Sequence, residues 1–192
     1  MDKPVVMRIC ARLALAFWLW QPPQAPALQP AETVEETVTA QIAFTPGEDA
    51  AHVVVQALLA SRRQVLVQAF SFTHRDIARA LIQARARGVD VQVIADAEQT
   101  GLIENNVIPE LAAAGIPVFL DAEHVAAHNK VMVIDEGQPA AAVITGSFNF
   151  TFGAQFRNAE NLLLLRGGPR IVRAYADNWR RHRAHSRPYS RP

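Results

Sequence analysis

The stretch HNKVMVIDEGQPAAAVITGSFN, residues 128–149, indicates how the middle of this chain folds. Residues 128–134 alternate polar and apolar side chains before becoming wholly apolar, which predicts a strand whose first part borders a cleft. The sequence EGQP at 136–139 predicts a turn, and the apolar run 140–145 predicts a second strand that returns antiparallel. The predicted hairpin therefore brings the last residues of the stretch back to the level of its start.

Two residues of the first predicted strand, His128 and Lys130, are the first functional candidates. A period of two residues places both side chains on one face. An imidazole beside an ammonium suits a hydrophobic core poorly, because the lysine would need a buried counter-charge, but the pair suits binding and attacking a phosphate. The chain has seventeen arginines and only two lysines, and the other lysine is Lys3 in the N-terminal segment. The strand therefore predicts phosphate chemistry.

Asp135 does not fit a triad with His128, although both residues are polar and close in sequence. Seven residues of straight strand span roughly 23 Å at about 3.3 Å per residue, and the two side chains point to opposite faces. We therefore expect Asp135 to accept hydrogen bonds where the strand ends and the turn begins. Gly146, Ser147 and Asn149 follow the second strand, where small and amide side chains can donate hydrogen bonds to phosphate oxygens.

These residues resemble the signature of the phospholipase D superfamily, which reads H-x-K, four residues, D, and then G-S-x-N. The matching residues are His128, Lys130, Asp135, Gly146, Ser147 and Asn149. Ten residues separate the aspartate from the glycine, where the family has about six, and a longer hairpin turn accommodates the difference. The likeness to the short bacterial endonuclease branch, with one signature per chain, runs from about Ile42 to Trp179.

The resemblance implies an α/β/α sandwich with a mixed central sheet, a homodimer that shares one active site, and chemistry without a metal or cofactor. In this mechanism His128 of one subunit forms a phosphohistidine, and His128 of the partner subunit protonates the leaving group. Lys130, Asn149 and Ser147 stabilise charge on the phosphate oxygens. The resemblance also points to Glu160 as the residue that orients the nucleophilic ring, while Asp135 and Gly146 support the site.

The remaining sequence alternates predicted strands with predicted helices, which favours an α/β layer structure. We expect strands at 42–44, 65–70, 89–95, 117–120 and 158–165. We expect helices over 51–59, from Thr73 to a stop at Gly88, over 107–115, and from Pro169 to Trp179. The Phe-rich segment after Asn149 is interpreted as core and interface packing.

The sequence divides into four parts. Residues 1–27 have early cations, a short apolar run and a small-residue pattern, so we interpret them as an export signal and expect a periplasmic or secreted protein. A retained anchor is the alternative, although the apolar run covers only about 12 Å as a helix. Residues 28–41 are predicted to be a solvated lead-in, residues 42–179 the catalytic domain, and residues 180–192 a basic C-terminal tail.

Charge is unevenly distributed, although the net charge is only +1. Residues 170–192 contain seven arginines and a single acidic residue. Arg180, Arg181 and Arg183 are therefore candidates for binding nucleic-acid phosphates. A solubilising end that binds nothing, or attraction to anionic lipid, explains the same charges.

The function that we expect is that of a phosphodiesterase, most simply a non-specific endonuclease cleaving DNA or RNA. Within the same class, a phospholipase D that acts on phospholipid headgroups remains open, with residues 148–156 contacting lipid. From another class, the chain could be an inactive nucleic-acid-binding module, which the intact His128 and Lys130 argue against. A metal-dependent nuclease is disfavoured, because no compact ligand cluster is visible in the sequence and His124 is expected to be a solvated loop residue.

Overall fold

The computed structural model describes residue 28 and residues 30–190, and residues 34–190 are treated below as one compact unit. The predicted export signal at 1–27 lies outside the described residues. Within the described part of the chain, no helix combines the length and the apolar character needed to cross a membrane.

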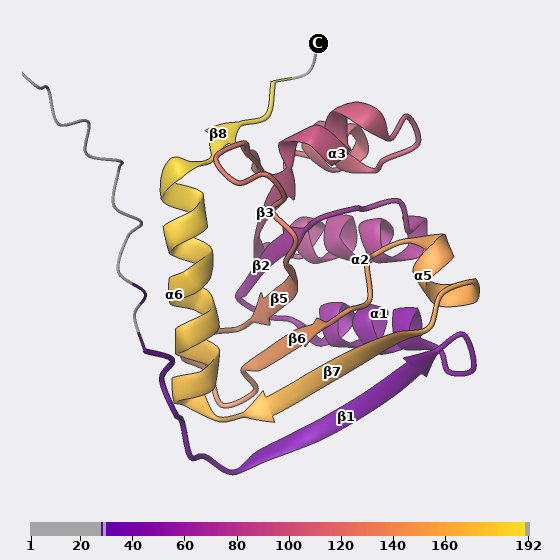
Figure 1. Ribbon diagram of the computed structural model, residues 1–192. Helices are drawn as coiled ribbons and strands as arrows, with labels where there is room; N and C mark the ends of the chain where they lie inside the picture. The colour runs from indigo at the N-terminus through magenta and orange to yellow at the C-terminus, as the bar shows by residue number, and fades with distance from the viewer. Residues whose placement is uncertain (1–27, 29, 191–192) are drawn as a thin grey trace, which may run out of the picture. The chain divides into compact units, whose positions relative to one another are not determined.

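A mixed sheet of eight strands forms the middle layer (Figure 1). The strands are β1 (Val38–Thr45), β2 (Gln64–Ala69), β3 (Asp90–Asp96), β4 (Val118–Asp121), β5 (Lys130–Ile134), β6 (Ala142–Gly146), β7 (Glu160–Gly167) and β8 (Arg187–Pro188). Their order across the sheet is β1-β7-β6-β5-β2-β3-β4-β8. The strands β2, β3 and β4 are parallel, and β5, β6 and β7 are paired antiparallel, which confirms the predicted hairpin.

Six helices accompany the sheet in the described residues. They are α1 (Ala50–Ala60), α2 (Arg75–Ala86), α3 (Ala97–Leu102), α4 (Ile108–Ala113), α5 (Phe152–Phe156) and α6 (Pro169–His185). The helices α1 and α2 cover one face, while α6 crosses the other face (Figure 1). The predicted α/β/α sandwich with a mixed sheet is confirmed.

Two hydrophobic cores separate the layers, because the central strands are apolar on both faces. The larger core joins α1, α2 and α4 to one face of the sheet and includes Leu58, Leu81 and Met132. The smaller core packs α6 on the other face through Val172 and Trp179, and Trp179 Nε1 donates a hydrogen bond to the Val67 carbonyl at 2.9 Å. Helix α6 is thus fixed to the centre of the sheet.

Several boundaries differ from the sequence interpretation. Part of the expected lead-in, Val38–Gln41, belongs to β1, because this edge strand pairs along its whole length with β7. Helix α6 continues through the expected boundary at residue 180 to His185, and the chain then returns to pair with β4 as β8. The N-cap of α2 is His74, not Thr73. The short helices α3 and α5 were not expected.

Candidate active site

The hairpin of β5 and β6, together with β7, brings the signature residues to one end of the sheet. Lys130 begins β5 and pairs with Ala69 at the end of β2. Gly146 ends β6 and pairs with Leu162 near the start of β7. The strand β5 starts at Lys130, so His128 lies in the loop before the strand rather than in the strand itself.

His128 and Lys130, which the sequence analysis expected on one face, are in direct contact. Lys130 Nζ lies 2.8 Å from His128 Nδ1 and donates a hydrogen bond to the His128 carbonyl at 2.7 Å. His128 is exposed, whereas Lys130 is buried. An ammonium can only donate, so Nδ1 is the acceptor in this contact, and a neutral ring in this arrangement has its proton on Nε2.

The surroundings of Lys130 make its ammonium easier to deprotonate than a free lysine. Burial lowers the pKa of Lys130, and the negative charge of Glu160 opposes part of that effect. A buried ammonium without a close carboxylate contact is poorly solvated, so a phosphate oxygen would be a favourable partner for it.

Phe70 is a part of the site that the sequence analysis did not single out. Its ring centroid lies 4.4 Å from that of His128, and Lys130 Nζ lies 5.0 Å from the ring centroid. The ring therefore supports the imidazole and stacks beneath the ammonium, which fixes both groups without offering either a competing acceptor. Phe70 follows Ala69, the residue of β2 that pairs with Lys130, so its place in the site depends on the strand register.

Gly146 and Ser147 are held by Asn161 of β7. Gly146 has φ of 143°, and an added Cβ would clash with the Asn161 carbonyl oxygen and lie 3.0 Å from Asn161 Oδ1. The backbone amides of Ser147 and Phe148 donate to that same carbonyl at 3.1 Å. Ser147 Oγ accepts from Asn161 N and Nδ2 at 3.0 and 3.2 Å. The glycine is required because two backbone segments approach closely here.

Asn149 brings an unpaired polar atom to the same end of the sheet. Its Oδ1 is buried and has no hydrogen-bond partner within the described residues. The Asn149 carbonyl accepts from Thr151 N at 2.7 Å, which fixes the backbone at the start of α5. A buried amide oxygen without a partner is costly, so Oδ1 would favour a hydrogen-bond donor from a ligand or another chain.

Asp135 has the structural position that we expected. It is buried, and its carboxylate accepts hydrogen bonds from the backbone amides of Arg62, Arg63 and Gln64 at 2.7–3.2 Å. Its φ of 52° is in the left-handed region, which Asp tolerates better than most residues. Asp135 therefore joins the hairpin turn to the start of β2, at the end of the sheet away from His128.

Of Glu160 and the three candidate arginines, only Glu160 acts on a residue of the signature, while the arginines have contacts elsewhere. Glu160 accepts from Asn158 Nδ2 at 3.0 Å and acts electrostatically on Lys130, so its proposed contact with the His128 ring stays a prediction. Arg180 forms ion pairs with Glu136 and Asp177, and Arg181 donates to Asn178 at 3.2 Å. The Arg183 guanidinium lies 3.3 Å from the Phe119 ring centroid. These residues belong to α6, not to a separate tail.

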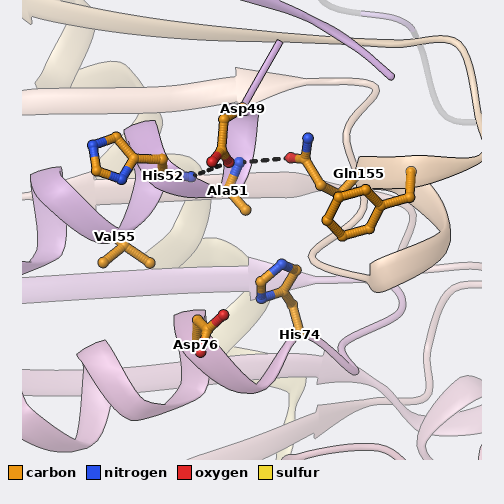
Figure 2. A pocket seen from close by; sticks show the side chains of 8 residues that line it. Asp49, Ala51, His52, Val55, His74, Asp76 and Gln155 are labelled. Carbon is orange, nitrogen blue, oxygen red and sulfur yellow. Dashed lines mark hydrogen bonds between the residues drawn. The ribbon is translucent and has the colours of Figure 1, made fainter. Parts of the chain in front are cut away.

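A separate hollow of about 270 Å³ lies beside α1, α2 and α5 (Figure 2). Its lining includes Asp49, His52, His74, Asp76 and Gln155, without any lysine or arginine. Burial lowers the pKa of His74, although the charge of Asp49 opposes this. With two carboxylates and no cation, the hollow is a poorer place for a phosphate than the surroundings of Lys130.

Comparison with known proteins shows the family to which this chain belongs. The family model described as cardiolipin synthase, PLD-like domain, matches residues 54–183. A phospholipase D of Rickettsia typhi is 37% identical over 137 residues, which are 71% of this chain and 64% of that protein. The mitochondrial cardiolipin hydrolase of Homo sapiens is 34% identical over 118 residues, 62% of this chain and 45% of that protein. The chain thus spans less than two thirds of the length of either relative.

A solved structure agrees with the sequence relatives. The crystal structure of Nuc from Salmonella typhimurium, a phospholipase D family member, matches with a TM-score of 0.74 and 29% identity, over 81% of this chain and 100% of that chain. The fold and the paired histidine and lysine define the class, that of PLD-like domains. The chain belongs to the phospholipase D superfamily.

Proposed function

We propose that this protein is a phosphodiesterase with His128 as its nucleophile, and that it is a non-specific endonuclease for DNA or RNA. The observation that carries the proposal is the contact of Lys130 Nζ with His128 Nδ1 at 2.8 Å. This pair stands at the same end of the sheet as Asn149, which follows Gly146 at the end of β6. A phosphodiester is the substrate class that such groups suit, because its charged oxygens can accept hydrogen bonds from the ammonium and from the Asn149 Nδ2 group while the imidazole attacks phosphorus.

The chemistry follows two displacement steps. In the first, His128 Nε2 attacks phosphorus, a P–N bond forms, and the P–O bond to the leaving group breaks. In the second, water attacks phosphorus and breaks the P–N bond. When the phosphate binds, its oxygens compete for the Lys130 ammonium that otherwise contacts Nδ1. Release of Nδ1 lets the proton move to that nitrogen and leaves Nε2 with the lone pair that the attack needs.

A second imidazole supplies the acid and base, and a homodimer provides it. His128 of the partner subunit acts as an imidazolium when it gives a proton to the leaving alkoxide, and the neutral ring that results then removes a proton from the attacking water. Residues 146–156 would border the dimer contact, and the exposed rings of Phe152 and Phe156, about half exposed and 4.5 Å apart, support this placement. Export through residues 1–27 would place the dimer in the periplasm or outside the cell.

Phospholipid hydrolysis is the second candidate. The names of the Rickettsia and human relatives point to it, because both describe lipid hydrolases. On this chain, Ile42 and Phe44 of β1 join Phe152 and Phe156 as large apolar side chains that are more than half exposed. These four residues could contact a lipid surface if they do not lie in a dimer contact.

The decisive experiment compares nicking of supercoiled plasmid with headgroup release from phosphatidylcholine and cardiolipin vesicles, using one enzyme preparation in EDTA. The endonuclease proposal expects nicking that His128→Asn abolishes, with headgroup release at least 100-fold slower per enzyme. Fast headgroup release without nicking would replace the nuclease with a phospholipase. Neither activity, from protein shown to be folded by circular dichroism, would favour an inactive binding module.

A further inference from the structure

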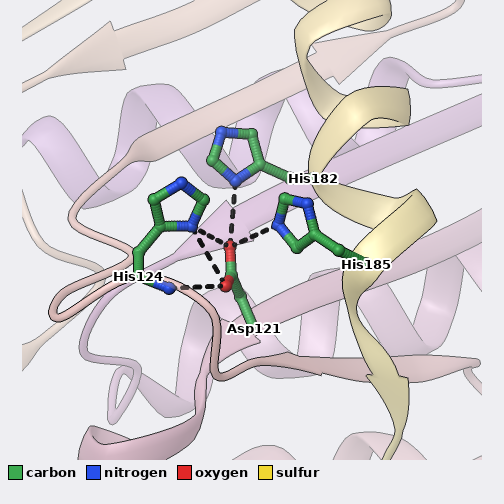
Figure 3. Close-up of side chains that lie close together, drawn as sticks. All are labelled: Asp121, His124, His182 and His185. Carbon is green, nitrogen blue, oxygen red and sulfur yellow. Dashed lines mark hydrogen bonds and ion pairs between the residues drawn. The ribbon is translucent and has the colours of Figure 1, made fainter. Parts of the chain in front are cut away.

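Four side chains that are distant in sequence meet at the C-terminal end of α6. Asp121 is the last residue of β4, His124 follows it in the loop, and His182 and His185 are one turn apart in the last turn of α6 (Figure 3). The pairing of Leu120 with Arg187 draws the chain after α6 back onto β4. The fold therefore holds the end of α6 directly over the end of β4.

The three imidazoles face a single carboxylate oxygen. Asp121 Oδ2 lies 2.9 Å from His182 Nδ1, 3.1 Å from His124 Nδ1 and 3.2 Å from His185 Nε2. The ring centroids form a nearly equilateral triangle with sides of 4.9, 5.2 and 5.3 Å. One potential ligand atom from each residue lies within 4.8 Å of the others.

Hydrogen bonding alone accounts poorly for this convergence. A carboxylate oxygen has two lone pairs, yet three ring nitrogens lie within hydrogen-bond distance of Oδ2, and each would need its proton on that nitrogen. His124 Nδ1 alone has a second acceptor, Asp121 Oδ1 at 3.2 Å, and that oxygen already accepts from the Glu123 amide. A bound cation resolves the conflict, because each nitrogen then presents its lone pair instead. We propose that Asp121, His124, His182 and His185 bind a divalent transition-metal ion of the zinc type.

The ligand types and distances suit such an ion. Three neutral imidazoles and one carboxylate favour Zn²⁺ over Mg²⁺ or Ca²⁺, which prefer oxygen ligands. Bonds of about 2.0–2.2 Å in a tetrahedron place the ligand atoms about 3.4 Å apart, so small side-chain rotations close the present arrangement. The negative end of the α6 dipole adds a further attraction for a cation.

Outer contacts already orient two of the ligands. The Glu123 amide donates to Asp121 Oδ1 at 3.1 Å, which fixes the carboxylate with Oδ2 toward the histidines. The second ring nitrogen of His185, Nδ1, lies 3.7 Å from Glu123 Oε2, the kind of carboxylate that supports a ligating histidine. The Asp121 side chain is fully buried, whereas 44% of the His124 side chain is exposed, so the ion has an entry path.

The ion would be structural and would not take part in the hydrolysis. From Lys130 the register crosses β2 and β3 to Leu120 of β4, three strand spacings or about 14 Å. The loop that carries His124 runs directly into His128, and Asp96 Oδ2 accepts from Ala127 N at 2.8 Å near its end. Metal binding would therefore tie α6 and β4 to the loop that leads into the nucleophile.

The test uses the full chain purified without a polyhistidine tag. After dialysis with Zn²⁺, elemental analysis should find one zinc per chain. Zn²⁺ at 100 times its dissociation constant should raise Tm by about 5–10 °C, while Mg²⁺ should not. Co²⁺ should give the visible absorption of a tetrahedral site. The double variant His182→Gln/His185→Gln should lose all three effects, and the matched control His52→Gln, an exposed histidine on α1, should keep them.

Two results would overturn the proposal. One is an unchanged Tm with Zn²⁺ together with no retained zinc, which would leave the cluster as a hydrogen-bonded network. The other is zinc retention that the double variant does not reduce, which would place the metal elsewhere. If the double variant does not fold, His124→Gln removes the most exposed ligand and should weaken zinc binding at least tenfold. None of these measurements depends on turnover, so they are independent of the proposed endonuclease activity.

Discussion

Replacing Asp135 tests whether the signature aspartate acts on structure or on catalysis. Its carboxylate accepts from three backbone amides, and a hydrogen bond to a charged group contributes about 1.5–3 kcal/mol. Water can reach part of this segment, so we expect Asp135→Ala to lower the free energy of unfolding by about 3–5 kcal/mol. At about 2–4 °C per kcal/mol, Tm should fall by about 6–20 °C.

The backbone at Asp135 provides an internal control. Because φ is 52°, alanine also adds roughly 1 kcal/mol of left-handed strain that glycine avoids, so Asp135→Gly should be less destabilised by that amount. Asp177→Ala, on the exposed face of α6, should stay within about 0.5 kcal/mol of wild type.

Urea unfolding measures the stability of these variants, and turnover per folded molecule is measured well below each Tm. We expect turnover within about threefold of wild type for every Asp135 variant, because the side chain binds the turn and not His128. A loss of stability under about 1 kcal/mol, or a 100-fold loss of turnover in a folded Asp135→Asn protein, would refute this reasoning.

Three further predictions concern the site and its assembly. Lys130→Arg should reduce kcat at least 100-fold, because a planar guanidinium does not replace a compact ammonium. Near-normal rates for this variant would mean that Lys130 contributes only a positive charge. Burial lowers the pKa of Lys130, so kcat/KM of the wild type should begin to fall at an alkaline pH below about 10.4, where free lysine titrates. The charge of Glu160 opposes this lowering, so Glu160→Gln should move the alkaline fall of kcat/KM to still lower pH. If the alkaline fall of kcat/KM stayed at the same pH in Glu160→Gln, the charge of Glu160 would not act on the pKa of Lys130. Sedimentation should find a dimer at concentrations where turnover is measured, and full activity at monomer mass would rule out a shared site.

Much of the fold could be predicted because local patterns and long-range packing agree. The alternation around Lys130, the EGQP turn and the buried runs at 65–70 and 89–95 correspond to strands in one mixed sheet. His128 and Lys130 were expected to share one face of a strand; their side chains are in contact, but His128 lies in the loop before β5. The role of Asp135 followed from a distance argument that excluded a catalytic pair.

Other features depend on contacts that no local pattern reveals. The cluster at Asp121 joins residues about sixty positions apart, so it forms only in the folded chain and is not visible as a compact ligand cluster in the sequence. His124 is an exposed loop residue, as expected, but its ring is also paired with Asp121. His182 and His185 are three residues apart, a spacing that places both on one face of a helix, although the arginines around them make the segment resemble a basic tail.

The boundary at residue 180 was misplaced for the same reason. High arginine content indicates a solvated tail when only composition is considered. In the structure, Trp179 fixes α6 to the sheet, Arg180 pairs with Glu136, and Arg183 packs on Phe119, so these residues continue an ordered helix. Nucleic-acid binding by this segment stays a prediction.

The central claim is that His128 becomes covalently bound to phosphorus, and trapping this intermediate tests it most directly. The enzyme is mixed with bis(4-nitrophenyl) phosphate, quenched in alkali during the first turnovers, digested and analysed by mass spectrometry. The account predicts a 4-nitrophenyl phosphoryl group on the peptide that contains His128, with one nitrophenolate released per adduct and no adduct in His128→Asn. Steady turnover with no adduct, or an adduct on another residue, would contradict it.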